Sequence, residues 1–363
     1  MKFYRLNEIL KLKATYYMIF GERSNGKTFA VLEHILKKYC EKKEQGVIVR
    51  REKEDIVGNN GKQLFENLVV NGVVKELTKG KWDYVEYKSS AFYLAKFDDK
   101  LDKVVLDREP FAHAICLSGS EHKKSIAFPK VTTIFFDEFI SRTRYLQDEF
   151  VLFMNLISTI VRFRDNVEIF MCANTVNREC IYFKEMGLRR VKQQKQGTID
   201  VYHFGESKLK VAVEYTSISD VDGKPSDVYF AFDNPKLNMI TSGAWEVALY
   251  PHCPCKYKPK DVKFNFFILF SEEILHGEIV IKGKERFIYI HRKTTPLKNP
   301  DKDLIYSTDV SPRKNWSRRI IIPRNKIENE IVKFFKEEKV FYQDNEVGET
   351  VNAYIDWCKR TKI

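Results

Sequence analysis

The chain has 363 residues, of which 44% are hydrophobic, and it carries a formal net charge of +12. That length allows a sizeable core and roughly two domains. The chain has no apolar run of about 18 residues, so we predict no transmembrane helix. The N-terminus lacks the apolar stretch of a signal peptide. We therefore expect a cytosolic protein without membrane contact. The positive charge suits a phosphate-rich partner such as nucleic acid, but a generally basic, solvated surface would explain it equally.

The seven cysteines are scattered along the chain in no pairing pattern. In a cytosolic protein this predicts reduced thiols. The segment His252-Cys253-Pro254-Cys255 is the one close cluster that suggests zinc. No second ligand pair follows at metal-binding spacing, so we predict no zinc site in this segment.

The N-terminal region predicts a strand, a loop and a helix in succession. Residues 14–20 form a short apolar run with high β propensity, as a buried strand does. After the loop at 21–28, apolar residues recur at helical spacing from Phe29 to Tyr39. Val47-Ile48-Val49 predicts the next strand. A strand, a helix and a strand joined by one crossover form the unit of a parallel sheet.

The loop carries a complete phosphate-binding motif, G-x-x-x-x-G-K-[ST]. Such a loop wraps a β-phosphate with its backbone N–H groups, and the following helix adds the positive end of its dipole. Lysine in this motif reaches the β- and γ-phosphates, and the last hydroxyl is a ligand of Mg²⁺. We therefore predict an Mg·ATP site formed by Gly21, Glu22, Arg23, Ser24, Asn25, Gly26, Lys27 and Thr28.

A second apolar strand is predicted at 131–136, and two acidic residues follow it. A carboxylate at such a strand end can hold the Mg²⁺ shell, and an adjacent one can polarise the attacking water. We assign these roles to Asp137 and Glu138, respectively.

A helix at 147–161 and a core strand at 167–172 complete an alternating pattern, which predicts an α/β domain with a largely parallel sheet. Asn174, just past that strand, could sense the γ-phosphate or simply end the strand in a turn. Arg162 and Arg164 lie between the helix and the strand. Each could be an arginine finger or a surface arginine.

The remaining segments are expected as follows. Residues 58–63 are predicted to be a loop, 80–106 and 200–250 short strands with turns, and Pro251 to Pro259 a lysine-rich linker. Two β-rich runs follow, 262–270 and 278–291, the second with a hairpin turn at 282–284. Helices are predicted at 326–338 and near 348–360. We expect an ATPase domain over 1–225, a linker region over 226–260 and a C-terminal domain over 261–363.

Taken together, these motifs resemble the DNA-packaging (encapsidation) ATPase family of small tailed phages with protein-primed genomes. The likeness spans roughly residues 14–180. It is carried by the order of six features: Arg23 in the loop, Val49-Arg50-Arg51, Lys124-Ser125-Ile126-Ala127-Phe128-Pro129, Asp137-Glu138-Phe139-Ile140, Arg162-Phe163-Arg164 and Asn174.

The resemblance implies an additional-strand (ASCE) ATPase fold related to large-terminase motors. It implies a five-membered ring on the capsid portal, or connector, that pulls double-stranded DNA into a procapsid. Such a motor would act in the host cytoplasm, bind the procapsid transiently and be absent from the mature virion. Some members of this family use a structural packaging RNA, and the sequence does not say whether this chain does.

The resemblance also implies roles for particular residues. Arg162 matches a trans-acting arginine finger, and Lys124 matches a second basic residue that reaches across the subunit boundary. Lys53 lies where the family has a lysine implicated with DNA.

For the C-terminal part the resemblance implies a small RNase H-like domain that has lost its nuclease chemistry. A nuclease of that kind needs clustered carboxylates for two metals, and the first candidate strand, 264–270, contains none. We therefore expect a binding domain. Arg313, Lys314, Arg318 and Arg319 surround Trp316, as in a phosphate-binding surface, although a solvated basic face is the alternative.

Three alternative functions remain open. A ring helicase or another P-loop translocase would use the same nucleotide chemistry. A nucleotide-regulated adaptor would bind ATP without turnover, which Glu138 directly after Asp137 disfavours. An active nuclease-terminase is disfavoured by the missing strand carboxylates.

Overall fold

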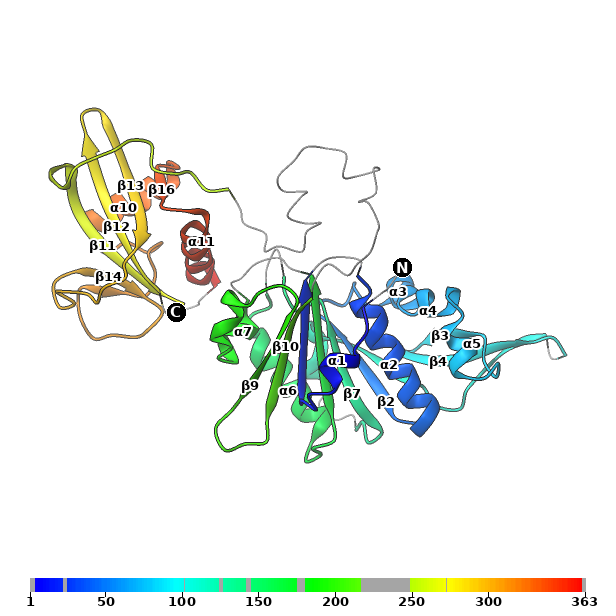
Figure 1. Ribbon diagram of the computed structural model, residues 1–363. Coiled ribbons are helices and arrows are strands. Elements are labelled where there is room, and N and C mark those ends of the chain that lie inside the picture. Colours follow the sequence, from blue (N-terminus) through cyan, green and yellow to red (C-terminus); the bar gives the residue numbers. More distant parts are fainter. Residues whose placement is uncertain are drawn as a thin grey trace. The chain divides into compact units, whose positions relative to one another are not determined.

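A computed structural model describes residues 4–21, 25–100, 102–123, 127–141, 145–174, 180–216, 249–271 and 273–360 (Figure 1). The chain forms two compact units, Met1–Glu246 and Val247–Ile363. Four residues with predicted roles, Glu22, Arg23, Ser24 and Lys124, lie outside the described residues. No helix in the described part has the length and apolar character needed to cross a membrane.

The first unit is built on a sheet that has ten strands in the described residues. Its order is β3-β4-β6-β2-β7-β8-β1-β10-β9, with β5 paired to β4. The strands are β1 (Tyr16–Gly21), β2 (Gln45–Arg50), β3 (Tyr84–Lys88), β4 (Ala91–Asp98), β5 (Lys103–Leu106), β6 (Ala112–Cys116), β7 (Val131–Asp137), β8 (Glu168–Asn174), β9 (Thr198–His203) and β10 (Lys210–Thr216).

The centre of this sheet, from β6 through β2, β7, β8 and β1 to β10, is entirely parallel. The outer strands β3, β4, β5 and β9 pair antiparallel with their neighbours. Every residue of β1 and β7 is buried, as expected for parallel strands covered on both faces. The four strands predicted from apolar runs in this region are confirmed as β1, β2, β7 and β8. Because β8 lies between β1 and β7, one additional strand separates the phosphate-loop strand from the strand that ends in Asp137.

Helices cover both faces of this sheet (Figure 1). On one face lie α1 (Asn7–Leu10), α2 (Lys27–Lys42), α3 (Gly58–Gln63), α4 (Glu66–Val70) and α5 (Val73–Leu77). On the other lie α6 (Glu149–Val161), α7 (Ile181–Glu185) and the 3₁₀ segments η1 (Leu117–Lys123) and η2 (Arg189–Gln193). Successive residues of β1 alternate between the two cores: Met18 and Phe20 face one, Tyr17 and Ile19 the other.

The prediction of a loop at 58–63 is wrong, because these residues form α3. Glycine and asparagine have low helix propensity, so the local pattern carries no helical signal. Packing overrides that preference. Gly61 is buried, and a Cβ there would lie 2.5 Å from the Ile56 carbonyl oxygen and 2.6 Å from the Tyr87 ring.

The second unit has a sheet of order β15-β14-β11-β12-β13-β16. Its described elements are η3 (Pro259–Asp261), β11 (Val262–Phe270), β12 (Glu273–Lys282), β13 (Glu285–Arg292), β14 (Leu304–Ser307), β15 (Trp316–Ser317), α10 (Lys326–Lys336), β16 (Val340–Tyr342) and α11 (Asn345–Arg360). The strands β11, β12 and β13 form an antiparallel meander, whereas β14, β15 and β16 pair parallel with their neighbours.

The predicted strand at 262–270, the hairpin turn at 282–284 and both C-terminal helices are confirmed. Gly283 has φ 60°, which the tight turn between β12 and β13 requires. The helices α10 and α11 pack on one face of the sheet, where Ile331, Phe334 and Tyr354 join the core of Phe266 and Ile288. Residues ahead of β11 also belong to this unit, because the Tyr342 N–H donates to the Pro251 carbonyl at 2.8 Å.

Candidate nucleotide-binding site

The described ends of the phosphate loop have backbone conformations that favour glycine. Gly21 closes β1 with φ 144°, and a Cβ there would lie 2.3 Å from the Thr216 hydroxyl oxygen. Gly26 precedes the first residue of α2 and has φ 92°. A side chain at either position would be strained, so the two glycines allow the turn from strand to helix.

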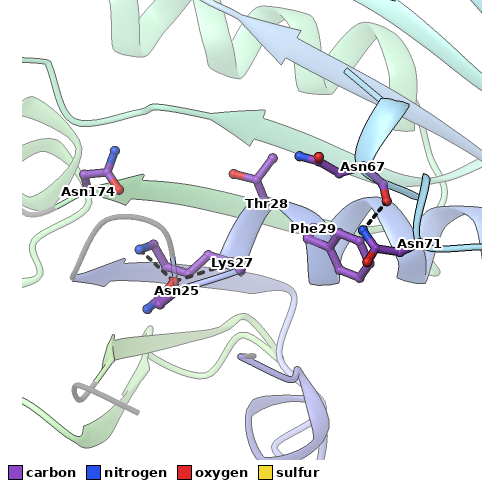
Figure 2. Close-up of a pocket in the computed structure, with 8 residues that line it drawn as sticks. Asn25, Lys27, Thr28, Phe29, Asn67, Asn71 and Asn174 are labelled. Atoms are coloured by element: carbon purple, nitrogen blue, oxygen red, sulfur yellow. Dashed lines mark hydrogen bonds between the residues drawn. The ribbon is translucent and has the colours of Figure 1, made fainter. Parts of the chain in front are cut away.

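Asn25 and Lys27 interact inside this loop, with both side chains buried (Figure 2). The Lys27 ammonium donates to Asn25 Oδ1 at 3.1 Å, and Asn25 Nδ2 donates to the Thr216 hydroxyl at 3.0 Å. Thr216 in turn donates to the Phe20 carbonyl at 3.2 Å. Thr216, at the end of β10, therefore anchors Asn25, and Asn25 in turn holds the Lys27 ammonium within the loop.

A cavity of about 460 Å³ opens above the start of α2. Figure 2 shows Phe29 and two asparagines of the α4 region on one side of Thr28, and Asn174 on the other. Sequence reasoning missed Asn67 and Asn71, because nothing in their local pattern marks the α4 segment as part of this site. The described lining residues are Asn25, Gly26, Lys27, Thr28, Phe29, Asn67, Asn71 and Asn174.

Asp137 closes β7 directly beside the loop, and the residue is only 4% exposed. The Thr28 hydroxyl donates to Asp137 Oδ1 at 3.0 Å. Burial raises the pKa of Asp137, and the positive charge of Arg50 opposes that effect. Because β1 and β7 run parallel through β8, the residues predicted to share Mg²⁺ meet at the carboxyl edge of the sheet, where ligands bind in α/β folds.

The Thr28–Asp137 pair fits the coordination chemistry of Mg²⁺. This ion prefers oxygen ligands at about 2.0–2.1 Å in an octahedron, in which neighbouring ligands lie about 3 Å apart. A hydroxyl and a carboxylate oxygen separated by 3.0 Å match that spacing. The two residues can therefore hold one ion between them.

Arg50 joins the two acidic residues. It ends β2, and its guanidinium lies 2.6 Å from Asp137 Oδ2 and 3.2 Å from Glu138 Oε2. The Glu138 side chain is 58% exposed, whereas its backbone N–H donates to the Cys172 carbonyl at 2.7 Å with φ 65°. The sequence shows Arg50 only as part of a motif. Its contact with the carboxylates depends on the adjacency of β2 and β7.

Arg51 holds the backbone after Asp137. Its guanidinium makes a two-point contact with Glu149 at 2.8 and 2.9 Å and donates to the carbonyls of Glu138 and Phe139 at 3.0 Å. Glu149 has no exposed side-chain surface and also accepts the Tyr182 hydroxyl at 2.9 Å. This buried ion pair connects β2, α6 and the segment that carries Glu138.

Asn174 lies beside the phosphate loop. It ends β8 opposite Gly21 in the strand register, and its side chain lines the cavity. The strand next to the phosphate loop thus presents an amide to the same space as Lys27.

Arg162 and Arg164 lie at the opposite ends of the strands from the phosphate loop, near the first residue of β7. Arg164 donates to the carbonyls of Phe128, Pro129, Val131 and Ile160 at 2.6–3.1 Å, so it fixes the start of β7 and the end of α6. The length of β7, about 20 Å at about 3.3 Å per residue, separates this end of the strand from Asp137. Arg162 is exposed, with φ 51° and ψ −121°, and the neighbouring Phe163 is fully exposed.

The candidate nucleic-acid residues are on the surface, and most already make local contacts. Lys53 is exposed in the turn after β2, and Lys314 is exposed in the second unit. Arg313 pairs with Asp301 at 3.3 Å, and its guanidinium lies 5.8 Å from the centre of the Trp316 ring. Arg318 lies 5.3 Å from the centre of the Trp357 ring, and Arg319 is half-buried.

Comparison with known proteins identifies the family. A model of the Podovirus DNA encapsidation protein (Gp16) matches residues 1–191, just over half of the chain. The chain belongs to this family. It is 30% identical over 175 residues to the DNA packaging protein of Bacillus phage B103, a match that covers 47% of each protein. The chain therefore spans about half the length of the curated relatives that it matches.

Solved structures support the fold over the whole chain. The chain aligns with a chain of the bacteriophage Phi-29 viral genome packaging motor assembly with a TM-score of 0.61 at 20% identity, covering 99% of both chains. It also aligns with the Phi-28 gp11 DNA packaging motor with a TM-score of 0.55 at 16% identity, again over 99% of both. The predicted fold class, an α/β P-loop domain with a small β-rich C-terminal domain, is confirmed.

Proposed function

We propose that this chain is an ATPase that drives double-stranded viral DNA into a procapsid as one subunit of a ring. The observation that carries the proposal is the convergence of Lys27, Thr28, Asp137, Glu138 and Asn174 at one edge of the sheet, in the region matched by the encapsidation family. The motor assemblies to which the whole chain is structurally similar are consistent with it.

In the proposed mechanism the loop backbone and the N-terminus of α2 receive the phosphates, and Lys27 exchanges Asn25 for phosphate oxygens. Thr28 and Asp137 hold Mg²⁺, which neutralises developing charge on the phosphates when bound. Glu138, the exposed member of the acidic pair, orients the attacking water and accepts its proton. Arg50 pairs with both carboxylates and so holds Asp137 and Glu138 in their separate positions. Asn174 reports whether the γ-phosphate is present.

The position of Arg162 supports a ring. It lies at the sheet edge opposite its own nucleotide site, so a role in hydrolysis requires the site of a neighbouring subunit. Its strained backbone and the exposed Phe163 beside it suit a contact between subunits, since strain often persists at functional positions. We propose that Arg162 is a finger in trans, with Lys124 as a second basic residue from the same neighbour, in a ring of five.

The second unit is proposed to bind duplex DNA or the portal through the face that carries Arg313, Lys314, Arg318 and Arg319, with Lys53 as a further DNA contact on the ATPase unit. We include a structural packaging RNA among the proposed partners of the assembly. We further propose that the motor acts in the host cytoplasm while bound to the procapsid, and that its C-terminal unit cuts no DNA.

The test is a packaging assay with the full chain, procapsids, duplex DNA and Mg·ATP. We expect DNA-stimulated phosphate release together with DNA that becomes resistant to added nuclease, and neither with Lys27→Ala. Forked DNA should remain paired, because a packaging motor moves the duplex intact. Strand separation would instead indicate a helicase, and nucleotide binding without turnover would indicate an adaptor.

A further inference from the structure

Two histidines and a glutamate meet on the sheet of the second unit, on the face opposite α10 and α11. His276 and Glu278 are on β12, and His291 is on β13 directly across from His276. One ligand atom from each side chain lies within 4.8 Å of the other two, and all three residues are half-buried. It is the one such group of potential metal ligands in the described residues.

Hydrogen bonds orient both imidazoles as metal-binding histidines are oriented. His291 Nδ1 lies 3.0 Å from the Arg292 carbonyl, which can only accept, so this nitrogen carries the proton. Its Nε2, which then has the lone pair, lies 3.9 Å from Glu278 Oε2. His276 Nε2 lies 2.8 Å from Asn265 Oδ1, which leaves the lone pair on its Nδ1. Metal-ligating histidines regularly donate their other ring N–H to a carbonyl or another oxygen in this way.

The surrounding side chains hold the three groups in place. The Tyr257 hydroxyl donates to Glu278 Oε2, which orients the carboxylate. Phe267 stacks on His276 with ring centres 4.8 Å apart, and Tyr289 stacks on His291 at 5.6 Å. Ring stacking and the Tyr257 hydroxyl therefore hold the two imidazoles and the carboxylate next to one another.

We propose that His276, Glu278 and His291 bind a divalent transition-metal ion of the zinc type, which connects β12 to β13. Two imidazoles and a carboxylate suit Zn²⁺, whereas Mg²⁺ prefers oxygen ligands alone. Ligand atoms around a tetrahedral Zn²⁺ at about 2.0–2.2 Å lie about 3.4 Å apart, so the present spacing needs only small side-chain rotations. The ion would stabilise the second unit. This role is independent of the Mg·ATP chemistry proposed for the first unit.

The test measures Zn²⁺ binding to the full chain after chelation and dialysis, without nucleotide. We expect the His276→Gln and His291→Gln variants to bind Zn²⁺ at least about tenfold more weakly. We expect Tyr257→Phe to lose about 10- to 100-fold in affinity, the usual effect of removing a partner that orients a ligand. His203→Gln, which changes an exposed histidine on β9, is the matched control and should bind as the unaltered chain does.

Two measurements exclude trivial outcomes. Zn²⁺ should raise the unfolding temperature of the unaltered chain and of His203→Gln but not of the double variant His276→Gln/His291→Gln. A cooperative melting transition of this double variant without metal is the control that it is folded. Cys253→Ser/Cys255→Ser should still bind. Unchanged Zn²⁺ affinity in the double histidine variant, no binding by the unaltered chain, or loss of binding in the double serine variant would each overturn the proposed ligand set.

Discussion

At the scale of single residues, the two neighbouring acids differ because one is buried and the other is exposed. Asp137 is enclosed at the end of β7 beside Thr28, whereas Glu138 turns outward with positive φ. A buried carboxylate next to a hydroxyl suits a metal, and an exposed carboxylate can reach a water. The same arginine, Arg50, contacts both.

The proposed division of roles predicts the behaviour of Glu138→Gln. The variant should bind ATP with nearly unchanged affinity, because the amide keeps the shape of the side chain. It should hydrolyse ATP at least about 100-fold more slowly, the usual scale for loss of a positioned base. Single-turnover phosphate release measures this, with Lys27→Ala as the variant that loses hydrolysis through the phosphate loop. Near-normal turnover of Glu138→Gln would remove this residue from the mechanism.

Asp137 also predicts a dependence of stability on pH. Its pKa is raised by burial, so its contribution to stability is fully present below its unfolded pKa of about 3.8 and is lost as pH rises through the folded pKa. At pH 8 without Mg²⁺ the ionised carboxylate should therefore destabilise the fold. Asp137→Asn should melt at a higher temperature than the unaltered chain under these conditions, because Arg50 keeps Glu138 as a partner.

Mg·ATP should reverse that order, since a bound cation stabilises the ionised carboxylate, whereas the variant offers only a neutral amide in its place. Thermal unfolding with and without Mg·ATP makes the comparison within one experiment. A lower melting temperature of the variant without nucleotide would show that the Arg50 pairing outweighs the cost of burial.

At the scale of elements, the Arg51–Glu149 pair couples α6 to the segment that carries Glu138. Arg51→Met leaves the carboxylate of Glu149 buried without its cation, which we expect to lower the free energy of unfolding by about 3–5 kcal/mol. Hydrolysis should slow as well, because the carbonyls of Glu138 and Phe139 lose their donor. Urea unfolding and phosphate release measure the two effects.

The matched controls for this pair are Lys53→Met and Arg51→Met/Glu149→Gln. Lys53 is exposed, so its substitution should change stability by less than about 0.5 kcal/mol. The double variant removes both charges, so it should be more stable than the sum of the single changes predicts. Additive losses would mean that the two residues do not interact energetically.

At the scale of the whole molecule, Arg162 predicts cooperation between subunits. Arg162→Ala should bind ATP nearly normally and hydrolyse it about 10³–10⁵-fold more slowly, the range for loss of an arginine finger. Mixing it with Lys27→Ala should restore part of the activity, because one subunit supplies the phosphate loop and its neighbour the arginine. Mixed rings that form but show no recovery would make Arg162 a structural residue.

Arg164→Ala separates the structural effect from the catalytic one. It removes the hydrogen bonds that the guanidinium donates at the start of β7 and the end of α6, so its main loss should be in unfolding temperature. Arg162 is exposed, and its substitution should leave that temperature nearly unchanged.

The second unit forms its own compact core, so residues 247–363 should fold as an isolated fragment. We expect this fragment to bind duplex DNA without cutting it. The logarithm of the binding constant should fall linearly with the logarithm of salt concentration, with a slope of about −0.9 for each phosphate contacted. Filter binding across a salt series tests this, with Lys314→Ala expected to reduce the slope by about one. Metal-dependent cleavage by the purified fragment would contradict the loss of nuclease chemistry.

The sequence by itself determined the phosphate loop and its neighbouring elements. Gly21 to Thr28 are contiguous, and their glycines and hydroxyl express local backbone and ligand requirements that survive without knowledge of the fold. The apolar runs of β1, β7 and β8 were equally visible, because strands buried on both faces need no alternation. The helix α3 was missed, since contacts with Ile56 and Tyr87 outweigh its weak propensity.

Tertiary structure alone decided which distant side chains meet. Arg50 reaches Asp137 because β2 pairs with β7, and Asn67 reaches the cavity because α4 packs against the start of α2. His276 and His291 face each other because a hairpin aligns β12 with β13. The first two contacts depend on strand order or helix packing between segments far apart along the chain, and the histidine pair depends on the register of the hairpin. Local sequence patterns do not encode such pairings, because the energy that selects them comes from the assembled core.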